Sequence, residues 1–216
     1  MDVLTTTQLD TAAELLSGGA VVAVPTPRWY MLIARAADPA AAATILRVKQ
    51  RPEYKPLLLL VDALSTAEDR FLLSADACTL ARRLWPGDLA LRLPWRTDAK
   101  RLPAIGDPAL VGCPDGLLGQ LLRLTGELLS AAACSISTPA ATADDHPALT
   151  ADQVAAFGAQ AGAGIAAVVD GGICPQGRHM TIVDCPHGQS ARLHREGTVH
   201  SRAVAAALTE GASDVG

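Results

Sequence analysis

Three cations, Lys49, Arg51 and Lys55, lie within seven residues of one another. A guanidinium can hold a phosphate or carboxylate group through two parallel hydrogen bonds, and an ammonium adds a point charge. Pro52 and Pro56 restrict the backbone between the cations and so reduce the entropy that is lost on binding. This pattern indicates a site for an anion with several charged oxygens. A solvated loop that happens to be basic is the alternative interpretation.

Two of the expected elements must position these cations. Asp38-Pro39 is typical of a helix start, with an N-cap residue followed by a first-turn proline. The helix that begins there is expected to run through Val48 and to place Lys49 at its end. The apolar run at 57–61 follows Lys55 closely and reads as a buried strand. The cations are therefore expected at a helix-to-strand junction.

The composition limits what the chain can be. It has 216 residues, of which 50% are hydrophobic and only 3% aromatic, so the core must be built mainly from Ala, Leu and Val. This length is enough for one large domain with a substantial core. The formal net charge of −4 and the pI of about 5.7 argue against direct nucleic-acid binding over a broad basic surface. They leave room for a local cationic pocket.

The cysteines and the apolar runs indicate the cellular compartment of the protein. The five cysteines are odd in number and none belongs to a Cys-x-x-Cys pair, so we interpret them as reduced packing thiols of a cytoplasmic protein. No apolar run approaches the ~20 residues that span a membrane. The segment Met1–Thr7 lacks the basic and apolar regions of a signal peptide.

Short apolar runs alternate with segments of helical periodicity, which predicts an α/β fold of about seven or eight short strands. No linker divides the chain, so residues 1–210 are expected to form a single domain and 211–216 a flexible tail. The strands are expected at 20–24, 57–61, 89–93, 109–113, 128–134, 166–169, 181–184 and 191–194. The helices are expected at 8–16, 39–48, 74–84, 117–124, 150–157 and 201–208.

Three local expectations are more specific. Thr26–Tyr30 is expected to be a loop. Ser65 and Glu68 have the spacing of a capping box at a helix start. The strand at 89–93 alternates Leu with Ala and Arg, which is typical of a half-exposed strand.

The order of the motifs resembles that of the YrdC-like family of threonylcarbamoyl-AMP synthases. Each motif alone is weak, but their joint order over roughly Leu9–Val199 is specific. By this resemblance the fold is a twisted mixed α/β sheet, with helices, around a concave cationic cavity. The matching segments are Pro25-Thr26 with Tyr30, Lys49-Gln50-Arg51-Pro52 with Lys55-Pro56-Leu57, Trp85-Pro86-Gly87, Leu102-Pro103 with Pro114, Cys134-Ser135-Ile136-Ser137, Val169-Asp170-Gly171-Gly172, Thr181-Ile182-Val183-Asp184 and Arg195-Glu196-Gly197.

The resemblance also implies an activity. Members of the family use ATP, bicarbonate and L-threonine, with Mg²⁺, to make threonylcarbamoyl-adenylate and pyrophosphate. Partner proteins of tRNA modification then transfer the threonylcarbamoyl group to adenosine 37 of tRNA. Such chemistry needs an amine and bicarbonate held together and phosphate charge neutralised by fixed cations, with little acid–base catalysis.

Individual roles follow from the same resemblance. Lys49 and Arg51 are expected to hold the triphosphate or the departing pyrophosphate, and Ser135 to donate to a phosphate oxygen, so these three form the expected catalytic set. Nucleotide binding is expected to include Lys55 and Arg195 as well. No metal ligands are expected from the protein. The expected substrate-binding residues are Thr26, Arg28, Tyr30, Lys55 and Thr181.

The sequence departs from the family pattern at four places, all on the amino-acid side of the expected site. Pro27-Arg28-Trp29 with Met31 replaces Asp-Thr-Val and Gly, and Gly112 stands where the family has a threonine-binding Arg. Ser137 replaces Asn, and Met180 replaces Ser. Arg28 could supply the missing guanidinium from across the pocket. Three hypotheses remain open: a changed acceptor substrate, a nucleotide- or RNA-binding protein without activity, and a normal synthase with compensating changes.

Two clusters have more than one interpretation. Cys174, His179, Cys185 and His187 lie close in sequence, but their spacing matches no zinc site and favours loop and packing roles. Asp144-Asp145-His146 is either a cation site or a solvated capping segment.

A glycine turn and two tryptophans are also ambiguous. Asp170-Gly171-Gly172 is either a phosphate cradle or a tight turn, and the turn is the simpler interpretation. Trp85 is expected in the core. Trp29 is the better candidate for contact with adenine or substrate.

Overall fold

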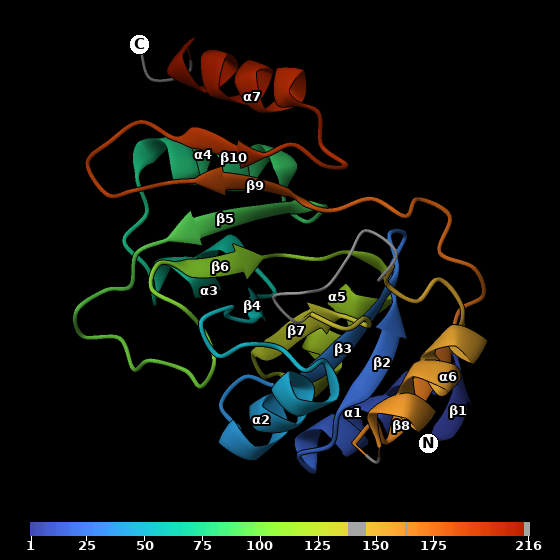
Figure 1. Cartoon of the computed structure of the whole chain (residues 1–216). Coiled ribbons are helices and arrows are strands. Elements are labelled where there is room, and N and C mark those ends of the chain that lie inside the picture. The colour runs from blue at the N-terminus through green and yellow to red at the C-terminus, as the bar shows by residue number, and fades with distance from the viewer. Residues whose placement is uncertain (138–145, 163, 214–216) are drawn as a thin grey trace.

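Ten strands in the described residues of the computed structural model form one mixed sheet (Figure 1), in the order β1-β8-β2-β3-β7-β4-β6-β5-β9-β10. The structure describes residues 1–137, 146–162 and 164–213. The strands are β1 (Asp2–Thr5), β2 (Val22–Pro25), β3 (Tyr30–Arg35), β4 (Leu58–Leu60), β5 (Leu89–Leu93), β6 (Ala109–Gly112), β7 (Leu129–Ala133), β8 (Ala167–Asp170), β9 (Thr181–Asp184) and β10 (Arg192–Arg195). The helices are α1 (Leu9–Ser17), α2 (Pro39–Val48), α3 (Leu64–Glu68), α4 (Ala75–Leu84), α5 (Gly116–Thr125), α6 (Ala151–Ala161) and α7 (Ser201–Ser213).

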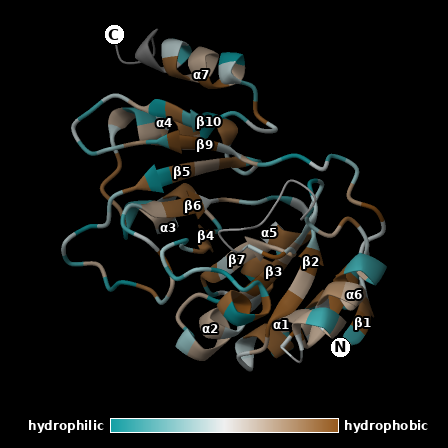
Figure 2. Ribbon diagram, viewed as in Figure 1, coloured by the Kyte–Doolittle hydropathy of each residue, from teal (hydrophilic) through white to brown (hydrophobic). Residues whose placement is uncertain are grey.

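Helices cover both faces of the sheet. α1 and α5 share an apolar core with one set of alternating residues of β2, β3, β7 and β8, and α2 and α6 pack on the opposite face. α4 and α7 pack together against β5, β6 and β9. Figure 1 shows α7 with the C-terminus at one end of the molecule and α6 with the N-terminus at the other. In Figure 2 the strongest apolar colour follows the central strands.

One face of β5 packs against helices, and its other face borders a cavity. Leu89, Leu91 and Leu93 pack in the core beneath α4 and α7. Ala90 and Arg92 point to the other face and line a cavity. The prediction of a half-exposed strand is therefore wrong, because the second face borders a cavity and Ala90 is buried within it.

α2 forms where the sequence predicts it. The Asp38 side chain accepts hydrogen bonds from the backbone N–H groups of Ala40 and Ala41, at 2.8 and 3.1 Å, and Pro39 occupies the first turn. The helix ends at Val48, and Gln50 then adopts a left-handed conformation with φ of 48°. This conformation turns the chain away from the helix axis just before Arg51.

Two strands were not expected from the sequence. β1 is an edge strand in which only Leu4 is buried, so its apolar pattern is weak, and it pairs in parallel with the distant β8. β3 follows a tight 26–29 turn and pairs antiparallel with β2 and β7. The loop expected at Thr26–Tyr30 is found at 26–29, because Tyr30 already begins β3, a central strand with residues buried on both faces.

Two boundaries also differ from expectation. The N-cap of α3 is Ala63, which has no capping side chain, so the expected box of Ser65 and Glu68 is wrong. The box pattern is displaced by two residues from the actual helix start. α7 continues through Ser213, into the segment expected to be a flexible tail, and 214–216 lie outside the described residues.

Candidate functional site

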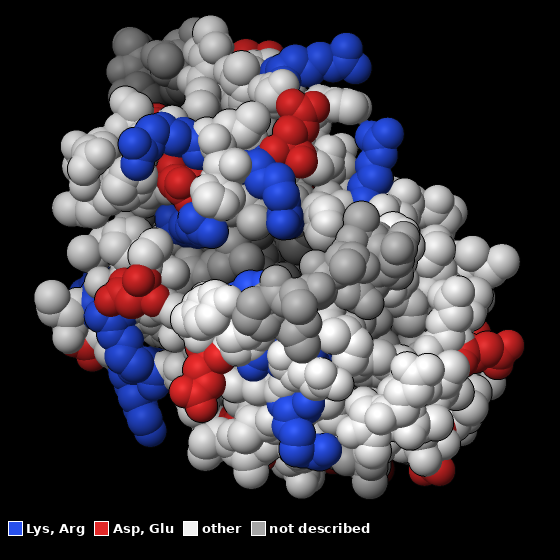
Figure 3. Space-filling model, viewed as in Figure 1, with Lys and Arg blue, Asp and Glu red and all other residues white. Residues whose placement is uncertain are grey.

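A cavity of about 840 Å³ lies between the α2–β4 loop and the strands β5, β9 and β10. Lys and Arg side chains gather around this hollow in Figure 3. No carboxylate is present among its described lining residues, so the positive charge is not neutralised within the lining itself. The cations that line it are Arg28, Lys49, Arg51, Lys55, Arg92 and Arg195.

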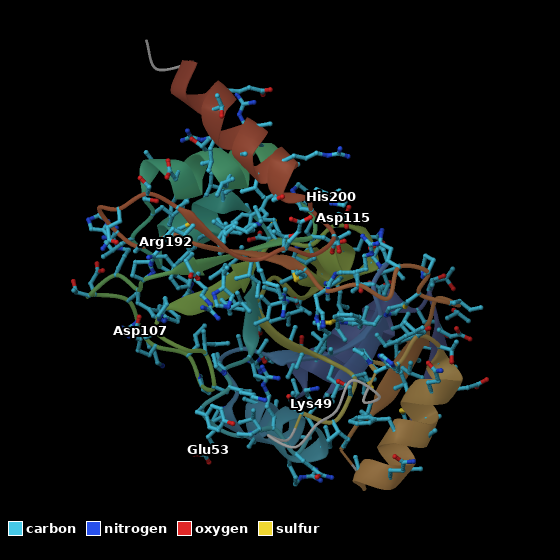
Figure 4. The ribbon with its side chains drawn as sticks, turned by 45° about the horizontal axis from the view of Figure 1, so that its top comes forward. Lys49, Glu53, Asp107, Asp115, Arg192 and His200 are labelled. Carbon is cyan, nitrogen blue, oxygen red and sulfur yellow. The ribbon has the colours of Figure 1, made fainter. Side chains whose placement is uncertain are left out.

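Lys49 is the most deeply buried of these cations, with only 1% of its surface exposed. Its Nζ atom donates to the backbone carbonyls of Ala133 and Ser135, where β7 ends. Figure 4 shows Lys49 inside the molecule, whereas Glu53 lies at its outer edge. Burial, followed by the nearby charge of Arg51, lowers the pKa of the Lys49 ammonium to about 7. Its charge is therefore responsive to an anion in the cavity.

Arg51 is held by its own loop. Its Nε donates to the carbonyl of Lys55 and its Nη2 to the carbonyl of Pro56, both at 2.8 Å. Its Nη1 donates to the Ser137 hydroxyl at 3.1 Å. Burial lowers the pKa of Arg51, but a guanidinium stays charged at neutral pH. A guanidinium has five N–H donors, so two remain for a ligand in the cavity.

Lys55 and Ser135 complete this first group of polar side chains. Both line the cavity and are half-buried. Neither side chain makes a hydrogen bond or ion pair within the described part of the chain. The N–H of Ser137 donates to the carbonyl of Lys49 at 2.8 Å, which fixes the 135–137 segment against the end of α2. The structure thus brings Lys49, Arg51, Lys55 and Ser135 together, as the sequence predicted.

Arg195, Arg28 and Arg92 form a second cationic group across the cavity. Arg195 donates from Nε and Nη2 to the carbonyl of Met180, at 3.4 and 3.2 Å. Its pKa is lowered by burial and then by the charges of Arg28 and Arg92. Arg28 is paired with Asp88 at 2.7 Å, and Arg92 with Asp184 at 3.3 Å. Among the described residues, only Arg195 in this group lacks a carboxylate partner.

Three of the expected substrate-binding residues lie off the main cavity. Thr26 caps its own turn, donating to the carbonyl of Trp29 at 2.7 Å. Tyr30 is fully buried, and its hydroxyl donates to the Gly172 carbonyl at 3.0 Å. Thr181 is also fully buried and donates to the Val199 carbonyl. These three side chains fix the loops around the cavity and do not line it.

Three of the four departures from the family pattern, at Gly112, Met180 and the segment Trp29–Met31, lie around one part of the cavity. A Cβ atom built on Gly112 would lie 3.3 Å from the Cε of Met180, so the methionine fills the space beside the glycine. Leu58 is the next nearest side chain, at 3.6 Å from that Cβ position. Met180 and Leu58 line the cavity with Met31, which accepts a hydrogen bond from the Trp29 indole at 3.2 Å. The middle of the cavity is therefore apolar.

The sequence interpretation missed Arg92 and His179 as cavity residues. Arg92 could have been found from the alternation of β5, which places it on the same face as Ala90. His179 packs edge-on against Trp29, with ring centroids 4.8 Å apart. Burial and the charges of Arg195 and Arg28 lower the pKa of His179, which favours a neutral imidazole. No local sequence signal indicates this position.

The structure bears on the Cys/His cluster and on the acidic cluster noted in the sequence. No zinc-like group of His, Cys, Asp and Glu occurs in the described residues. The five cysteines are free thiols. Asp144 and Asp145 lie outside the described residues.

The structure also shows the conformation of the glycine turn and the surroundings of Trp85 and Trp29. Asp170-Gly171-Gly172 is a tight turn in which Gly172 has φ of 79° and donates to the Asp170 side chain at 2.9 Å. Trp85 packs in the α4/α7 core and donates to the carbonyl of Leu89, as expected. Trp29 borders the cavity, although only 4% of its surface is exposed. Within the described chain, no helix is long and apolar enough to cross a membrane.

The cavity does not fit a magnesium ion held by the protein. Mg²⁺ prefers carboxylate and water oxygens, and the described lining offers no Asp or Glu. The described lining therefore offers no carboxylate ligands for a protein-bound Mg²⁺ ion.

The Sua5/YciO/YrdC family model, described as telomere recombination, matches residues 14–197. The chain belongs to this family. It is 34% identical over 183 residues to the threonylcarbamoyl-AMP synthase of Bacillus subtilis, covering 82% of this chain and 50% of that protein. It is 29% identical to the enzyme of the same name from Pyrococcus abyssi, covering 80% of this chain and 49% of that protein. The chain therefore spans about half the length of these curated relatives.

Solved structures of the family have the same fold. Pyrococcus abyssi Sua5, in complex with L-threonine, superposes with a TM-score of 0.80 at 25% identity, over 96% of this chain and 61% of that one. Escherichia coli YciO superposes with a TM-score of 0.76 at 18% identity, over 94% of this chain and 98% of that one. The predicted twisted mixed α/β sheet of a YrdC-like protein is confirmed.

Proposed function

We propose that this protein is an ATP-dependent synthase of a carbamoyl-adenylate, acting on L-threonine or a related amino acid. The observation that carries the proposal is the group Lys49, Arg51 and Lys55, which faces a cavity with no carboxylate in its described lining. Such a group needs an anion of several charges to neutralise it. The triphosphate of ATP, with Mg²⁺ bound to it, has that charge.

The reaction has two steps that this cavity suits. The amine of the amino acid first adds to bicarbonate, with loss of water, and gives a carbamate. A carbamate oxygen then attacks the α-phosphorus of ATP, the bond to the β-phosphate oxygen breaks, and pyrophosphate leaves. Both steps depend on holding anions close together, and the fixed cations offset their mutual repulsion.

The residues divide this work between the two sides of the cavity. In this proposal Lys49, Arg51 and Ser135 stabilise the triphosphate and the departing pyrophosphate, and Lys55 adds charge beside them. Arg195, which has no carboxylate partner in the described chain, binds the carboxylate of the amino acid or a phosphate oxygen. Arg28 is already paired with Asp88, so its expected role as the replacement guanidinium is limited to its unused donors.

The biological setting is part of the same proposal. The relatives are named threonylcarbamoyl-AMP synthases, which supports a role in the tRNA modification pathway and ATP, bicarbonate and an amino acid as substrates. We extend this to proteins of tRNA modification as partners that accept the adenylate, and to the cytoplasm as its location. The alternatives are a paralogue with a changed acceptor and a nucleotide- or RNA-binding protein without turnover.

The test is mass spectrometry of the purified protein after incubation with ATP, MgCl₂, bicarbonate and L-threonine, repeated with a panel of other amino acids. A carbamoyl-adenylate together with released pyrophosphate supports the proposal. If no amino acid gives an adenylate or pyrophosphate, the proposal of a synthase fails. Titration with ATP would then distinguish a nucleotide-binding protein from one that does not use the cationic cavity.

A further inference from the structure

The floor of the cavity between its two cationic groups is apolar and already packed. It is built by side chains that are buried in the core below and present one edge to the cavity. The described part of this floor has no hydroxyl, amide or carboxylate that faces a ligand. Its side chains are Trp29, Met31, Leu58, Leu110, Met180 and Ile182.

Met180 is central to this floor because Gly112 leaves room for it. The methionine Cε fills the space that a side chain at position 112 would need, and it packs against Leu58 there. Among these six side chains the one polar hydrogen is the Trp29 indole N–H, which donates to the Met31 sulfur. The His179 imidazole packs edge-on against Trp29 at the border of the floor. A ligand hydroxyl placed over Met180, Met31 and Leu58 would lose its water without gaining a partner from those three side chains.

A cation sits directly beside Met180. Arg195 binds the Met180 carbonyl through two of its donors and has others to offer. A carboxylate held by Arg195 would carry the rest of its molecule over the Met180 side chain and toward Met31 and Leu58. A second cavity of about 190 Å³ is lined by the same three floor residues and by Leu60 and Leu117. Its polar lining is Asp115, the Thr26 hydroxyl, which already donates to the Trp29 carbonyl, and the Arg28–Asp88 ion pair.

From these contacts we infer that the amino acid activated by this protein has an apolar side chain, of the size of valine, leucine or methionine. This inference rests on the proposed function, because it names the acceptor of that reaction. Met180 and Gly112 are its specificity-determining pair: the glycine admits the methionine, and the methionine presents an apolar surface to the substrate. Unbranched methionine side chains adapt to aliphatic groups of different shape.

The expected preference is moderate. An apolar site rejects an added hydroxyl by about a hundredfold at most. L-Valine and L-threonine have nearly the same shape, so their comparison isolates the hydroxyl. We expect kcat/KM for L-valine to exceed that for L-threonine by about tenfold to a hundredfold.

The experiment measures carbamoyl-adenylate formation from L-valine, L-leucine, L-methionine, L-threonine and L-serine, at saturating MgATP and bicarbonate. The Met180→Ser variant should lower the valine-to-threonine ratio by about tenfold, and Met180→Leu, the apolar control, should leave it unchanged. Thermal unfolding of both variants establishes that they are folded. A parent protein that uses L-threonine as well as or better than L-valine overturns the inference and leaves the proposed function standing.

A binding measurement separates the two proposals if turnover is absent. When no amino acid gives an adenylate, the proposed function fails. Calorimetric titration of L-valine and L-threonine into the protein then tests whether the apolar floor binds an apolar amino acid, independently of turnover. Tighter binding of L-valine that is lost in Met180→Ser supports an apolar amino-acid site. Equal binding, tighter binding of L-threonine, or no binding of either overturns it.

Discussion

The hydroxyl of Ser137 lies 3.1 Å from Nη1 of Arg51 and accepts its hydrogen bond. This contact joins the segment after β7 to the loop after α2, and both segments line the cavity. It gives a role to a residue that departs from the family pattern, because the shorter side chain still orients the guanidinium. Arg51 is thereby held by three partners, and two of its five donors remain unused among the described residues.

Removal of this contact should weaken nucleotide binding without unfolding the protein. In Ser137→Ala, Arg51 loses one of its three partners and becomes more mobile, so we expect the Kd for MgATP to rise by about threefold to tenfold, as for one hydrogen bond. Calorimetric titration measures this change. Ser130→Ala, at a buried position outside the cavity, is the matched control and should leave the Kd for MgATP unchanged. Parent-like affinity in Ser137→Ala would show that Arg51 needs no such support.

Loss of either principal cation should have a larger effect. Lys49→Met keeps the volume of the side chain but removes its charge, and Arg51→Ala removes the guanidinium, so each should weaken MgATP binding by about tenfold to a hundredfold. Lys100→Met and Arg192→Ala are matched controls, since both residues are exposed and outside the cavity lining, and Figure 4 shows Arg192 well away from Lys49. If both cavity variants bind MgATP as the parent does, the phosphate site has been misplaced.

Nucleotide binding should be coupled to protonation of Lys49. Its pKa of about 7, lowered by burial, means that the free protein holds this side chain largely neutral at pH 8. A bound triphosphate favours the charged form and raises the pKa, so MgATP binding at pH 8 should take up a proton. The measurement is calorimetry at pH 8 in two buffers of different ionisation enthalpy. The uptake should disappear in Lys49→Met, and its persistence there would assign it to another group.

Gly112 and Met180 should be energetically coupled. A methyl group added at Gly112 comes within 3.3 Å of the Met180 Cε, so Gly112→Ala forces the methionine to move and should lower the free energy of unfolding by up to about 1 kcal/mol. In a Met180→Ala background the same change meets only ordinary van der Waals contacts, with Leu58 and Leu60 at 3.6 and 3.9 Å, and should be neutral or stabilising. Urea denaturation of the four proteins gives the coupling energy. Additive effects would mean that the two side chains do not share this space.

Tyr30→Phe distinguishes a structural tyrosine from a substrate-binding one. The buried hydroxyl donates to Gly172 and accepts from the Gly171 N–H at 3.3 Å, so its loss leaves both backbone groups without that partner. We expect a loss of about 1–3 kcal/mol in stability and less than about a twofold change in the Kd for MgATP or in KM for the amino acid. A large change in KM with parent-like stability would return Tyr30 to the substrate site.

The parts of the site that follow local rules could be predicted from the sequence. Asp38 and Pro39 start α2, and the helix length then places Lys49 at the loop that carries Arg51 and Lys55. The depth of Lys49 could not be predicted, because the carbonyls that receive its ammonium belong to Ala133 and Ser135, far along the chain. Local sequence carries no information on such a contact.

The other differences between prediction and structure also arise from contacts between distant parts of the chain. Thr181 and Tyr30 lie in motifs that resemble substrate-binding ones, yet their hydroxyls bind Val199 and Gly172 in loops that only the folded chain brings near. The pairing of Gly112 with Met180 links two departures that look independent in the sequence. β3 was missed because a continuous apolar run does not distinguish strand from helix without its partners.

The order of strands in the sheet has a consequence for biosynthesis. β1 lies beside β8, with Asp2 opposite Ala167, and β5 lies beside β9, with Leu89 opposite Thr181. A ribosome must therefore translate most of the chain before either pair can close, and such distant pairings slow folding. Until then the cations of the α2–β4 loop and the apolar floor have no opposite wall. The nascent chain is therefore exposed to aggregation and to capture by chaperones for most of its synthesis.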